Sequence, residues 1–135
     1  ECLEFTQKLK VGVTVYNPLA AGLLTGKHKR DSGPVAGTRF DINDDYYGRF
    51  WHDVNFEAAE TLAGIAADAG LTSIELALRW LMSQAAVDSV ILGVSKVEHL
   101  EDNLAAADGR VDSDVMARCD EVWRSLRGPH FKYNR

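Results

Sequence analysis

The first place in this sequence where chemistry could occur is an apolar strand that runs into a loop of small residues. Residues 11–26 read VGVTVYNPLAAGLLTG, so Tyr16 stands where the strand ends. The small residues at 20–22 carry almost no side chain, which leaves room for a flat or anionic ligand. Tyr16 has two interpretations, either a stacking platform for a planar ring or an ordinary aromatic residue at the rim of the fold.

Asn17 is the second candidate in this segment, because it precedes Pro18. A residue before proline is biased toward extended geometry, so we expect its backbone and amide to point at the same opening as Tyr16. The alternative is a simple turn that only stops the strand.

A second junction of the same kind follows at residues 90–104, VILGVSKVEHLEDNL. Ser95 and Glu98 have the spacing of a capping box, so we expect Ser95 to begin a helix. A helix start favours phosphate because its first N–H groups are free and its dipole is positive there. Lys96 adds a cation, and Glu98 and Asn103 could bond a polar ligand that lies along the helix. The alternative is a plain capped helix on the surface.

Two arginines are further candidates for anion binding. Arg39 lies in a long loop, where its guanidinium could reach a phosphate or remain solvated. Arg135 is the last residue, which could fold over a site and bind an anion or belong to a disordered tail. The four histidines have no i, i+4 pairing and no partner cysteine, so the sequence predicts no metal site.

Composition narrows the class of protein. The chain has 135 residues, of which 46% are hydrophobic and 26% charged, as expected for one globular domain or part of one. A net charge of -5 argues against a dedicated nucleic-acid binder. No stretch approaches the roughly 20 apolar residues of a membrane span. Cys2 and Cys119 match no zinc spacing and indicate reduced thiols of an intracellular protein. The chain lacks an initiator Met, so we expect a cut chain or a partial sequence.

The pattern of apolar residues predicts alternating helices and strands. Helices are expected at 1–10, from Phe56 to Gly70, from Thr72 onward, from Ser95 to about 106 and from Asp112. Gly70 is the expected C-cap of its helix, and Thr72 and Glu75 have the spacing of a capping box. Strands at 11–15 and 87–94 have the continuous apolar character of parallel strands that are buried on both faces. Residues 26–53 form a polar, irregular loop with an aromatic cluster.

In the helix that precedes Gly70, Phe56, Ala59, Ala63 and Ala66 share the predicted apolar face. The following helix carries its own stripe, and so does the last helix. Those stripes comprise Ile74, Ala77, Leu78 and Leu81, and then Val111, Val115, Val122 and Leu126. Two parallel strands do not make a stable sheet alone, so the pattern predicts further strands beside them.

These segments resemble the aldo-keto reductase superfamily, and within it the branch of aflatoxin-aldehyde and succinic-semialdehyde reductases. VYNPLAAGLLTGKHK is similar to the strand-seven segment of that branch and VILGVSKVEHLEDNL to its strand-eight segment. ALRWLM at 77–82, RFW at 49–51 and the closing YNR fit as well. The resemblance covers essentially the whole chain, residues 1–135.

The resemblance implies an α/β fold, a (β/α)8 TIM barrel that binds NADP(H) in extended form. The lack of a GxGxxG motif therefore does not argue against a nicotinamide cofactor. This chain would be the C-terminal portion of that barrel, its last two parallel strands with their helices, and incomplete as a barrel. Residues 1–135 would form one partial NADP-dependent oxidoreductase domain.

The family's site residues carry over position by position. Tyr16 would stack on the nicotinamide, and the pyrophosphate would be lined by Asn17, Leu19, Ala21 and the backbone through Gly26. Arg39 resembles a loop residue near the cofactor. The adenosine and its 2′-phosphate would be held by Ser95, Lys96, Glu98, His99 and Asn103. Arg135 resembles a residue that contacts the carboxylate of substrates.

One cofactor position departs from the family. At His99 many members carry Arg, and this branch commonly carries Gln. The departure leaves the preference for NADPH over NADH open, with Ser95 and Lys96 as the remaining candidates for the 2′-phosphate.

The implied activity is NADPH-dependent reduction of aldehydes or ketones to alcohols, in the cytoplasm and on small-molecule carbonyl substrates. No nucleic acid or membrane is implied, and a homodimer is one arrangement of the complete form. The family's catalytic Asp, Tyr, Lys and His precede the matched region, so we expect this chain alone to be inactive. The alternative is a truncated, non-catalytic remnant that binds nucleotide, or an interaction module.

Overall fold

Two short parallel strands lie among helices in residues 2–127, the part of the chain that this computed structural model describes. In chain order the elements are α1 (Cys2–Leu9), β1 (Thr14–Tyr16), the 3-10 helices η1 (Ala20–Thr25) and η2 (Arg30–Ser32), α2 (Arg39–Ile42), α3 (Asp44–Phe50), α4 (Asp53–Asp68), α5 (Ser73–Met82), β2 (Ser89–Ile91), α6 (Val97–Ala106) and α7 (Ser113–Arg127). Strands alternate with helices, as the sequence predicts for a parallel sheet.

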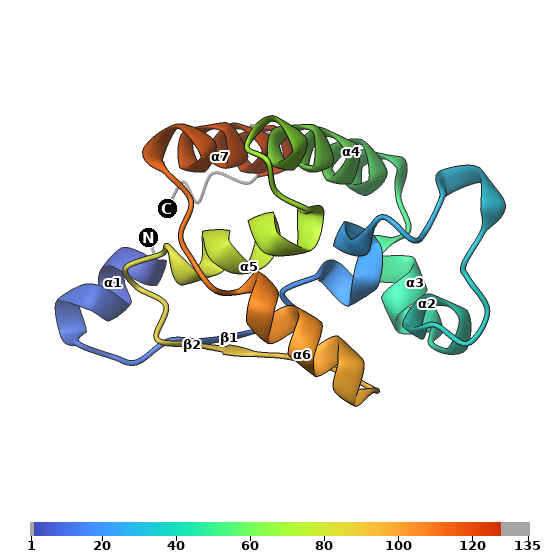
Figure 1. Ribbon diagram of the computed structural model, residues 1–135, viewed down its shortest axis with the longest axis horizontal. Helices are drawn as coiled ribbons and strands as arrows, with labels where there is room; N and C mark the ends of the chain where they lie inside the picture. Colours follow the sequence, from blue (N-terminus) through green and yellow to red (C-terminus); the bar gives the residue numbers. More distant parts are fainter. Residues whose placement is uncertain (1, 128–135) are drawn as a thin grey trace, which may run out of the picture.

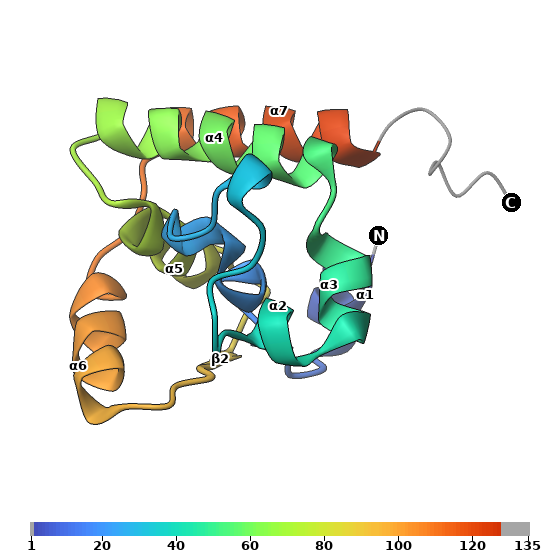
Figure 2. The same ribbon diagram turned by 90° about the vertical axis from the view of Figure 1, so that its right-hand side faces the viewer.

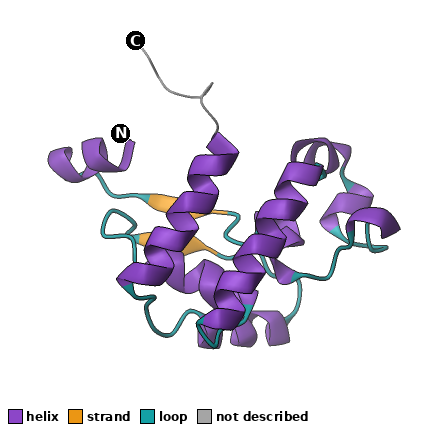
Figure 3. Cartoon of the chain, turned by 90° about the horizontal axis from the view of Figure 1, so that it is seen from above, coloured by secondary structure: helices purple, strands orange, loops and turns teal. Residues whose placement is uncertain are grey.

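The helices are arranged in layers around α5. Figure 1 shows α4 and α7 together along the top, with α5 between them and the two strands. Seen from above in Figure 3, α4 and α7 run next to each other. Helix α6 packs on α5, and Figure 2 shows α6 on one side of the fold and the α2–α3 pair on the other.

The strands pair in parallel, which confirms the predicted direction. Thr14 lies opposite Ser89, and Tyr16 lies opposite Ile91. Both strands are shorter than predicted, and before Thr14 a side chain takes part in the pairing. The backbone N–H of Val13 donates to the Asp88 carboxylate at 2.7 Å.

The prediction that both strands are buried on two faces is wrong for this chain. Tyr16 remains 70% exposed and Ile91 57% exposed. Among the described residues β1 and β2 pair only with each other, so no further strand covers their outer edges. Burial of a strand depends on neighbours that are distant in sequence, which the apolar pattern alone does not supply.

The main core lies between α4, α5 and α7. Its buried side chains are Ile65, Ala66, Leu76, Val115, Cys119 and Val122. The predicted stripe of α7 is confirmed, since Val111 and Leu126 pack against this cluster. On α4 the predicted Ala63 is exposed and Ile65 is buried instead.

The stripe predicted for α5 is incomplete. Leu78 is buried as expected, but Leu76 is buried too, because α5 has packed elements on more than one side. Leu76 joins the core that α5 shares with α4 and α7, whereas Leu78 is buried outside that cluster.

A second core forms where the sequence predicts an irregular loop. Residues 30–50 fold into η2, α2 and α3, which correct that prediction. Leu23, Phe40 and Phe56 are its buried members, and Trp51 packs against them with Tyr46 and Phe50. Seven aromatic contacts, most of them edge-to-face, link this cluster. Aromatic burial therefore folds a segment whose polar composition predicts an irregular loop.

Three predictions concern helix ends, and the first two are the C-cap at Gly70 and the capping box at Thr72. Gly70 has φ 69° and follows the α4 C-cap, and the N–H of Leu71 donates to the carbonyl of Ala66, as in a Schellman motif. The capping box of Thr72 and Glu75 is present with both of its hydrogen bonds. Both predictions are confirmed.

The second predicted capping box, which begins at Ser95, is wrong. The N-cap of α6 is Lys96, with φ -141° and ψ 151°, and no side chain caps this helix. The extended backbone at Lys96 starts the helix one residue later than the Ser95–Glu98 spacing indicates.

Two remaining properties concern the described residues. No single helix within 2–127 has the length and hydropathy of a membrane span, and the one pair that has them jointly, α4 with α5, is bent by 87°. Cys2 is an exposed free thiol and Cys119 a buried one.

Candidate functional site

The candidate site lies at the carboxyl ends of the two strands. Because Tyr16 pairs with Ile91 in parallel, the loops that follow both strands leave the sheet at the same edge. Ligands of α/β folds bind at this edge, where loops and helix starts converge. The Tyr16 ring is 70% exposed there, so its face is accessible.

Asn17 starts a tight turn rather than continuing the strand. Its φ is 59°, in the left-handed region, which corrects the extended geometry expected before Pro18. The Asn17 side-chain oxygen accepts the N–H of Ala21 at 2.7 Å, and its carbonyl accepts the N–H of Ala20 at 3.1 Å. Asparagine tolerates this conformation because its short amide bonds the nearby backbone.

The small residues continue in the left-handed region. Ala20 has φ 48°, Ala21 φ 58° and Gly22 φ 99°. Consecutive non-glycine residues with positive φ are uncommon, and such backbone tends to occur at functional sites. The Leu19 carbonyl accepts the N–H of Gly22 at 2.9 Å, which closes the turn.

The backbone N–H donors of this turn are all engaged in hydrogen bonds within the turn itself. The N–H groups of Ala20, Ala21 and Gly22 all bond within the loop. The loop therefore offers a ligand space and shape at these three residues, and any donors must come from side chains around it.

Two side chains that sequence reasoning missed lie against Gly22. A Cβ at Gly22 would lie 3.1 Å from Lys27 Cε, 3.3 Å from Lys27 Nζ and 3.8 Å from His28 Nε2. His28 is only 4% exposed, and burial lowers the pKa of its imidazole, with the Lys27 charge acting in the same direction. The one available sequence signal was a lysine directly after the loop-closing Gly26.

Arg39 lies in α2 and belongs to the aromatic cluster. Its guanidinium carbon lies 4.9 Å from the centre of the Tyr46 ring, in a cation–π contact. The structure therefore places Arg39 on the α2–α3 pair, which packs against η1, and not in an irregular loop.

The start of α6 is open to solvent. Ser95, Lys96, Glu98 and His99 are all exposed. Helix α6 is ten residues long and carries no side-chain cap, so its first N–H groups face solvent with the positive end of the helix dipole. Lys96 places a cation at the same end.

Asn103 is buried, whereas those four side chains are exposed. It is 8% exposed and shares the buried side of α6 with Ala106, one turn beyond His99. Arg135, the predicted substrate contact, lies outside the described residues. In residues 2–127 no group of three His, Cys, Asp or Glu side chains is placed to hold a metal ion.

One cavity lies away from this edge. A shallow groove of about 330 Å³ runs between α4 and α7, lined by Thr61, Ile65, Arg118, Glu121, Val122 and Ser125. It shares no residue with the strand ends, so it does not extend the candidate site.

Comparison with known proteins places this arrangement in a family. Residues 1–124 match the model of the aldo/keto reductase family. An aldo-keto reductase of Pseudocercospora fijiensis is 30% identical over 89% of this chain and 46% of its own length. Aflatoxin B1 aldehyde reductase member 2 of Mus musculus is 39% identical over 82% of this chain and 34% of its own. The chain spans less than half the length of the curated relatives it matches.

The fold also has a solved counterpart. A glycerol dehydrogenase of Gluconobacter oxydans superposes with a TM-score of 0.65 at 22% identity, covering 89% of this chain and 36% of that one. The predicted fold class is confirmed as the C-terminal portion of a TIM barrel, since the part of the chain that the structure describes has two parallel strands and no closed barrel.

Proposed function

Since the chain belongs to the aldo/keto reductase family, we propose that it forms the NADP(H)-binding part of a carbonyl reductase. Residues 1–135 would be one partial oxidoreductase domain. The complete form would reduce aldehydes or ketones to alcohols in the cytoplasm, with a homodimer as one arrangement. The two free thiols, Cys2 and Cys119, fit a reducing compartment.

The observation that carries this proposal is the pairing of Tyr16 with Ile91 at the ends of the two strands. It brings an exposed aromatic ring, a loop of small residues and the start of α6 to one edge. NADPH combines a flat nicotinamide with a pyrophosphate and a 2′-phosphate, so these three features suit its three parts.

In this proposal, different residues bind the nicotinamide and the pyrophosphate. Tyr16 stacks on the nicotinamide, since its ring is accessible at the strand end. The pyrophosphate follows the left-handed turn, where the bare Gly22 leaves room for the Lys27 side chain, whose Nζ would lie 3.3 Å from a Cβ at this position. The loop residues concerned are Asn17, Leu19, Ala21 and Gly26.

The adenosine and 2′-phosphate lie at the start of α6. The uncapped N–H groups of α6 and the Lys96 ammonium both favour phosphate. Ser95 and His99 are exposed beside them. Glu98 bonds the adenosine from the exposed side of α6, and Asn103 bonds it from the buried side, one turn further along the helix.

When bound, NADPH would supply the hydride from C4 of its nicotinamide to the substrate carbonyl. The family's catalytic Asp, Tyr, Lys and His are assigned to no residue of this chain. Its own residues therefore hold and orient the cofactor, and Arg39 joins α2 to α3 through its contact with Tyr46. We expect no turnover by the chain alone.

A second candidate function is an interaction module without catalysis. It is favoured by exposed apolar side chains around the strand ends, where Tyr16 is 70%, Ile91 57% and Val97 68% exposed. Exposed apolar patches mark interaction sites, and these three side chains would contribute to one.

NADPH fluorescence titration of the chain, with aldehyde turnover assayed alongside, tests the proposal. We expect binding that Tyr16→Ala weakens and no turnover without an added partner. Ile42→Ala is a matched control, because Ile42 is 74% exposed but lies on α2. Turnover at ordinary reductase rates would contradict the assignment to the cofactor part. Association with another chain in the absence of NADPH binding would favour the interaction module.

A further inference from the structure

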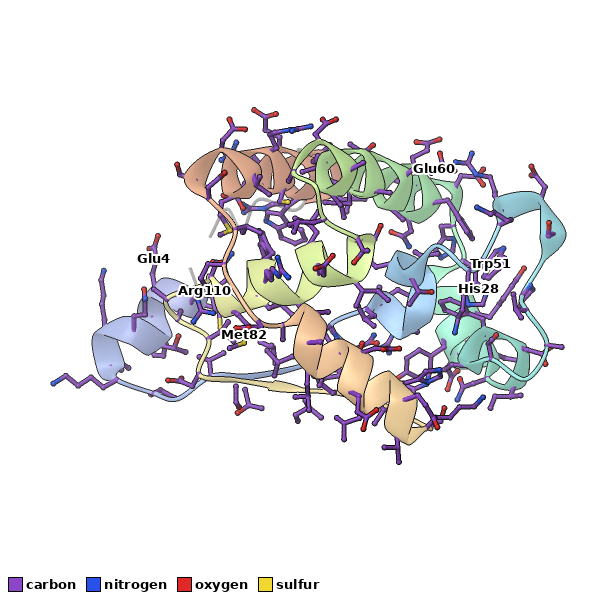
Figure 4. All side chains as sticks on the ribbon, viewed as in Figure 1. Glu4, His28, Trp51, Glu60, Met82 and Arg110 are labelled. Atoms are coloured by element: carbon purple, nitrogen blue, oxygen red, sulfur yellow. The ribbon has the colours of Figure 1, made fainter. Side chains whose placement is uncertain are left out.

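His28 is a buried polar side chain without an evident structural partner for one of its nitrogens. It is 4% exposed and lies edge-on to Phe40 at 4.9 Å and to Trp51 at 5.4 Å between ring centroids. Figure 4 shows His28 next to Trp51 at the end of the fold that carries the aromatic cluster. The rings hold the imidazole in place on two sides.

One hydrogen bond of His28 indicates its tautomer. Its Nδ1 accepts the backbone N–H of Val35 at 3.5 Å, so in the neutral imidazole the proton sits on Nε2. Nε2 has no hydrogen-bond partner among the described residues. A buried donor left without an acceptor is costly, and such groups commonly await a ligand or an ordered water.

The free donor of His28 points to the same place as a cation. A Cβ at Gly22 would lie 3.8 Å from His28 Nε2 and 3.3 Å from Lys27 Nζ, so both groups converge on the bare side of this glycine. The neighbouring backbone N–H groups are used within the turn, so these two side chains are the donors at this point.

We propose that His28 is a further phosphate-binding residue, whose Nε2–H donates to a phosphate oxygen that Lys27 attracts to the Gly22 turn. Lys27 is exposed on a flexible stem, so its ammonium moves aside and exposes Nε2 as the oxyanion enters. The inference rests on the proposed function only in taking the cofactor pyrophosphate as the source of the phosphate. A cation and a neutral donor beside bare backbone suit an oxyanion with several oxygens.

Two variants of His28 separate donation from packing. His28→Phe keeps an aromatic ring in the cluster and removes the donor, whereas His28→Gln restores an N–H donor. We expect His28→Phe to weaken both inorganic pyrophosphate and NADPH by roughly tenfold or more, as for one lost hydrogen bond to a charged group. His28→Gln should recover part of that loss.

His52→Phe is the matched control, since the His52 ring already bonds the carbonyl of Gly48 at 2.8 Å. It should leave both affinities unchanged. Unchanged affinity for both probes in His28→Phe would overturn the proposal.

Proton NMR of the imidazole measures the chemical shift of the His28 Nε2–H, which pyrophosphate would leave unchanged if His28 had only a structural role. Addition of pyrophosphate to the unaltered chain should shift the His28 Nε2–H resonance, and Lys27→Ala should abolish that shift. Absence of any shift at saturating pyrophosphate would also overturn the proposal, even if the His28 variants fail to fold. Pyrophosphate binding that depends on His28, without NADPH binding, would sustain this inference and refute the proposed function.

Discussion

Arg79 donates its Nε–H to the carbonyl of Ala106 at 3.0 Å, and so joins α5 to the last turn of α6. The same guanidinium donates to the Glu75 carboxylate at 2.7 Å, and its side chain is 19% exposed. Carbonyls in a last helical turn have no partner inside the helix. Arg79 supplies that partner and thereby fixes the helix whose other end carries the candidate phosphate site.

Arg79→Ala should therefore lower the free energy of unfolding by about 2 kcal/mol, because it leaves a part-buried carbonyl unsatisfied and removes a short ion pair. Urea unfolding followed by circular dichroism measures this change. Arg110→Ala is the control, since Arg110 is exposed and bonds only the carbonyl of its neighbour Gly109. Equal losses in the two variants would contradict a specific role for Arg79.

Thr72→Ala should cost about 1 kcal/mol of stability, the usual value of an N-cap. Thr72 Oγ1 accepts the N–H of Glu75 at 3.2 Å, and the Glu75 carboxylate accepts the Thr72 N–H at 2.8 Å. Ser95→Ala has the same chemistry but should change stability by less than about 0.5 kcal/mol, because Ser95 caps no helix. A comparable loss in both variants, again by urea unfolding, would mean that Ser95 does cap α6.

These two sites show how far sequence patterns reach. Thr72–Glu75 and Ser95–Glu98 have the same spacing, yet only the first forms a capping box. The pattern supplies the hydrogen-bonding groups, but the backbone at Lys96 decides where the helix begins, and helix ends shift easily by a residue. The parallel direction of the strands follows from the alternation of strands and helices along the chain, and the α7 stripe follows from a local pattern, so both were predictable.

Features that depend on contacts between residues distant in sequence could not be predicted from the sequence. Strand burial requires neighbouring strands, and within residues 2–127 the strand that ends at Tyr16 pairs with β2 alone. The site at Gly22 requires that residues 27–56 fold back onto the loop through aromatic packing. No spacing rule predicts that His28 is enclosed by Phe40 and Trp51.

Gly22→Ala and Gly37→Ala should separate backbone strain from loss of binding. Both glycines have positive φ, 99° and 72°, so each substitution should cost about 1 to 2 kcal/mol of stability. A Cβ at Gly22 would also push on Lys27, whereas nothing lies within 4 Å of a Cβ at Gly37. Titration should therefore show roughly tenfold weaker NADPH binding in Gly22→Ala than in Gly37→Ala. Equal affinities would argue against a ligand at the Gly22 turn.

Stability should fall in mild acid because of His28. Burial, followed by the charge of Lys27, lowers the pKa of His28 below its ordinary value of 6.5. The unfolded chain then takes up this proton first, so the stabilisation is complete above pH 6.5 and is lost as pH falls toward the lowered value. Urea midpoints across this range should decline in the unaltered chain, and His28→Phe should flatten that decline. A decline of unchanged size in the variant would assign it to other groups.

The last prediction concerns the choice between NADPH and NADH. Ser95→Ala combined with Lys96→Ala should weaken NADPH by roughly tenfold more than NADH, because only NADPH carries the 2′-phosphate that a cation at the start of α6 would bind. Ser95 caps no helix, so its loss removes a ligand contact without unfolding α6. Lys29→Ala is the charge-matched control, since Lys29 is exposed and lies outside that helix. Equal weakening of both cofactors in the double variant would contradict the assignment, because it would show contacts shared by the two nucleotides.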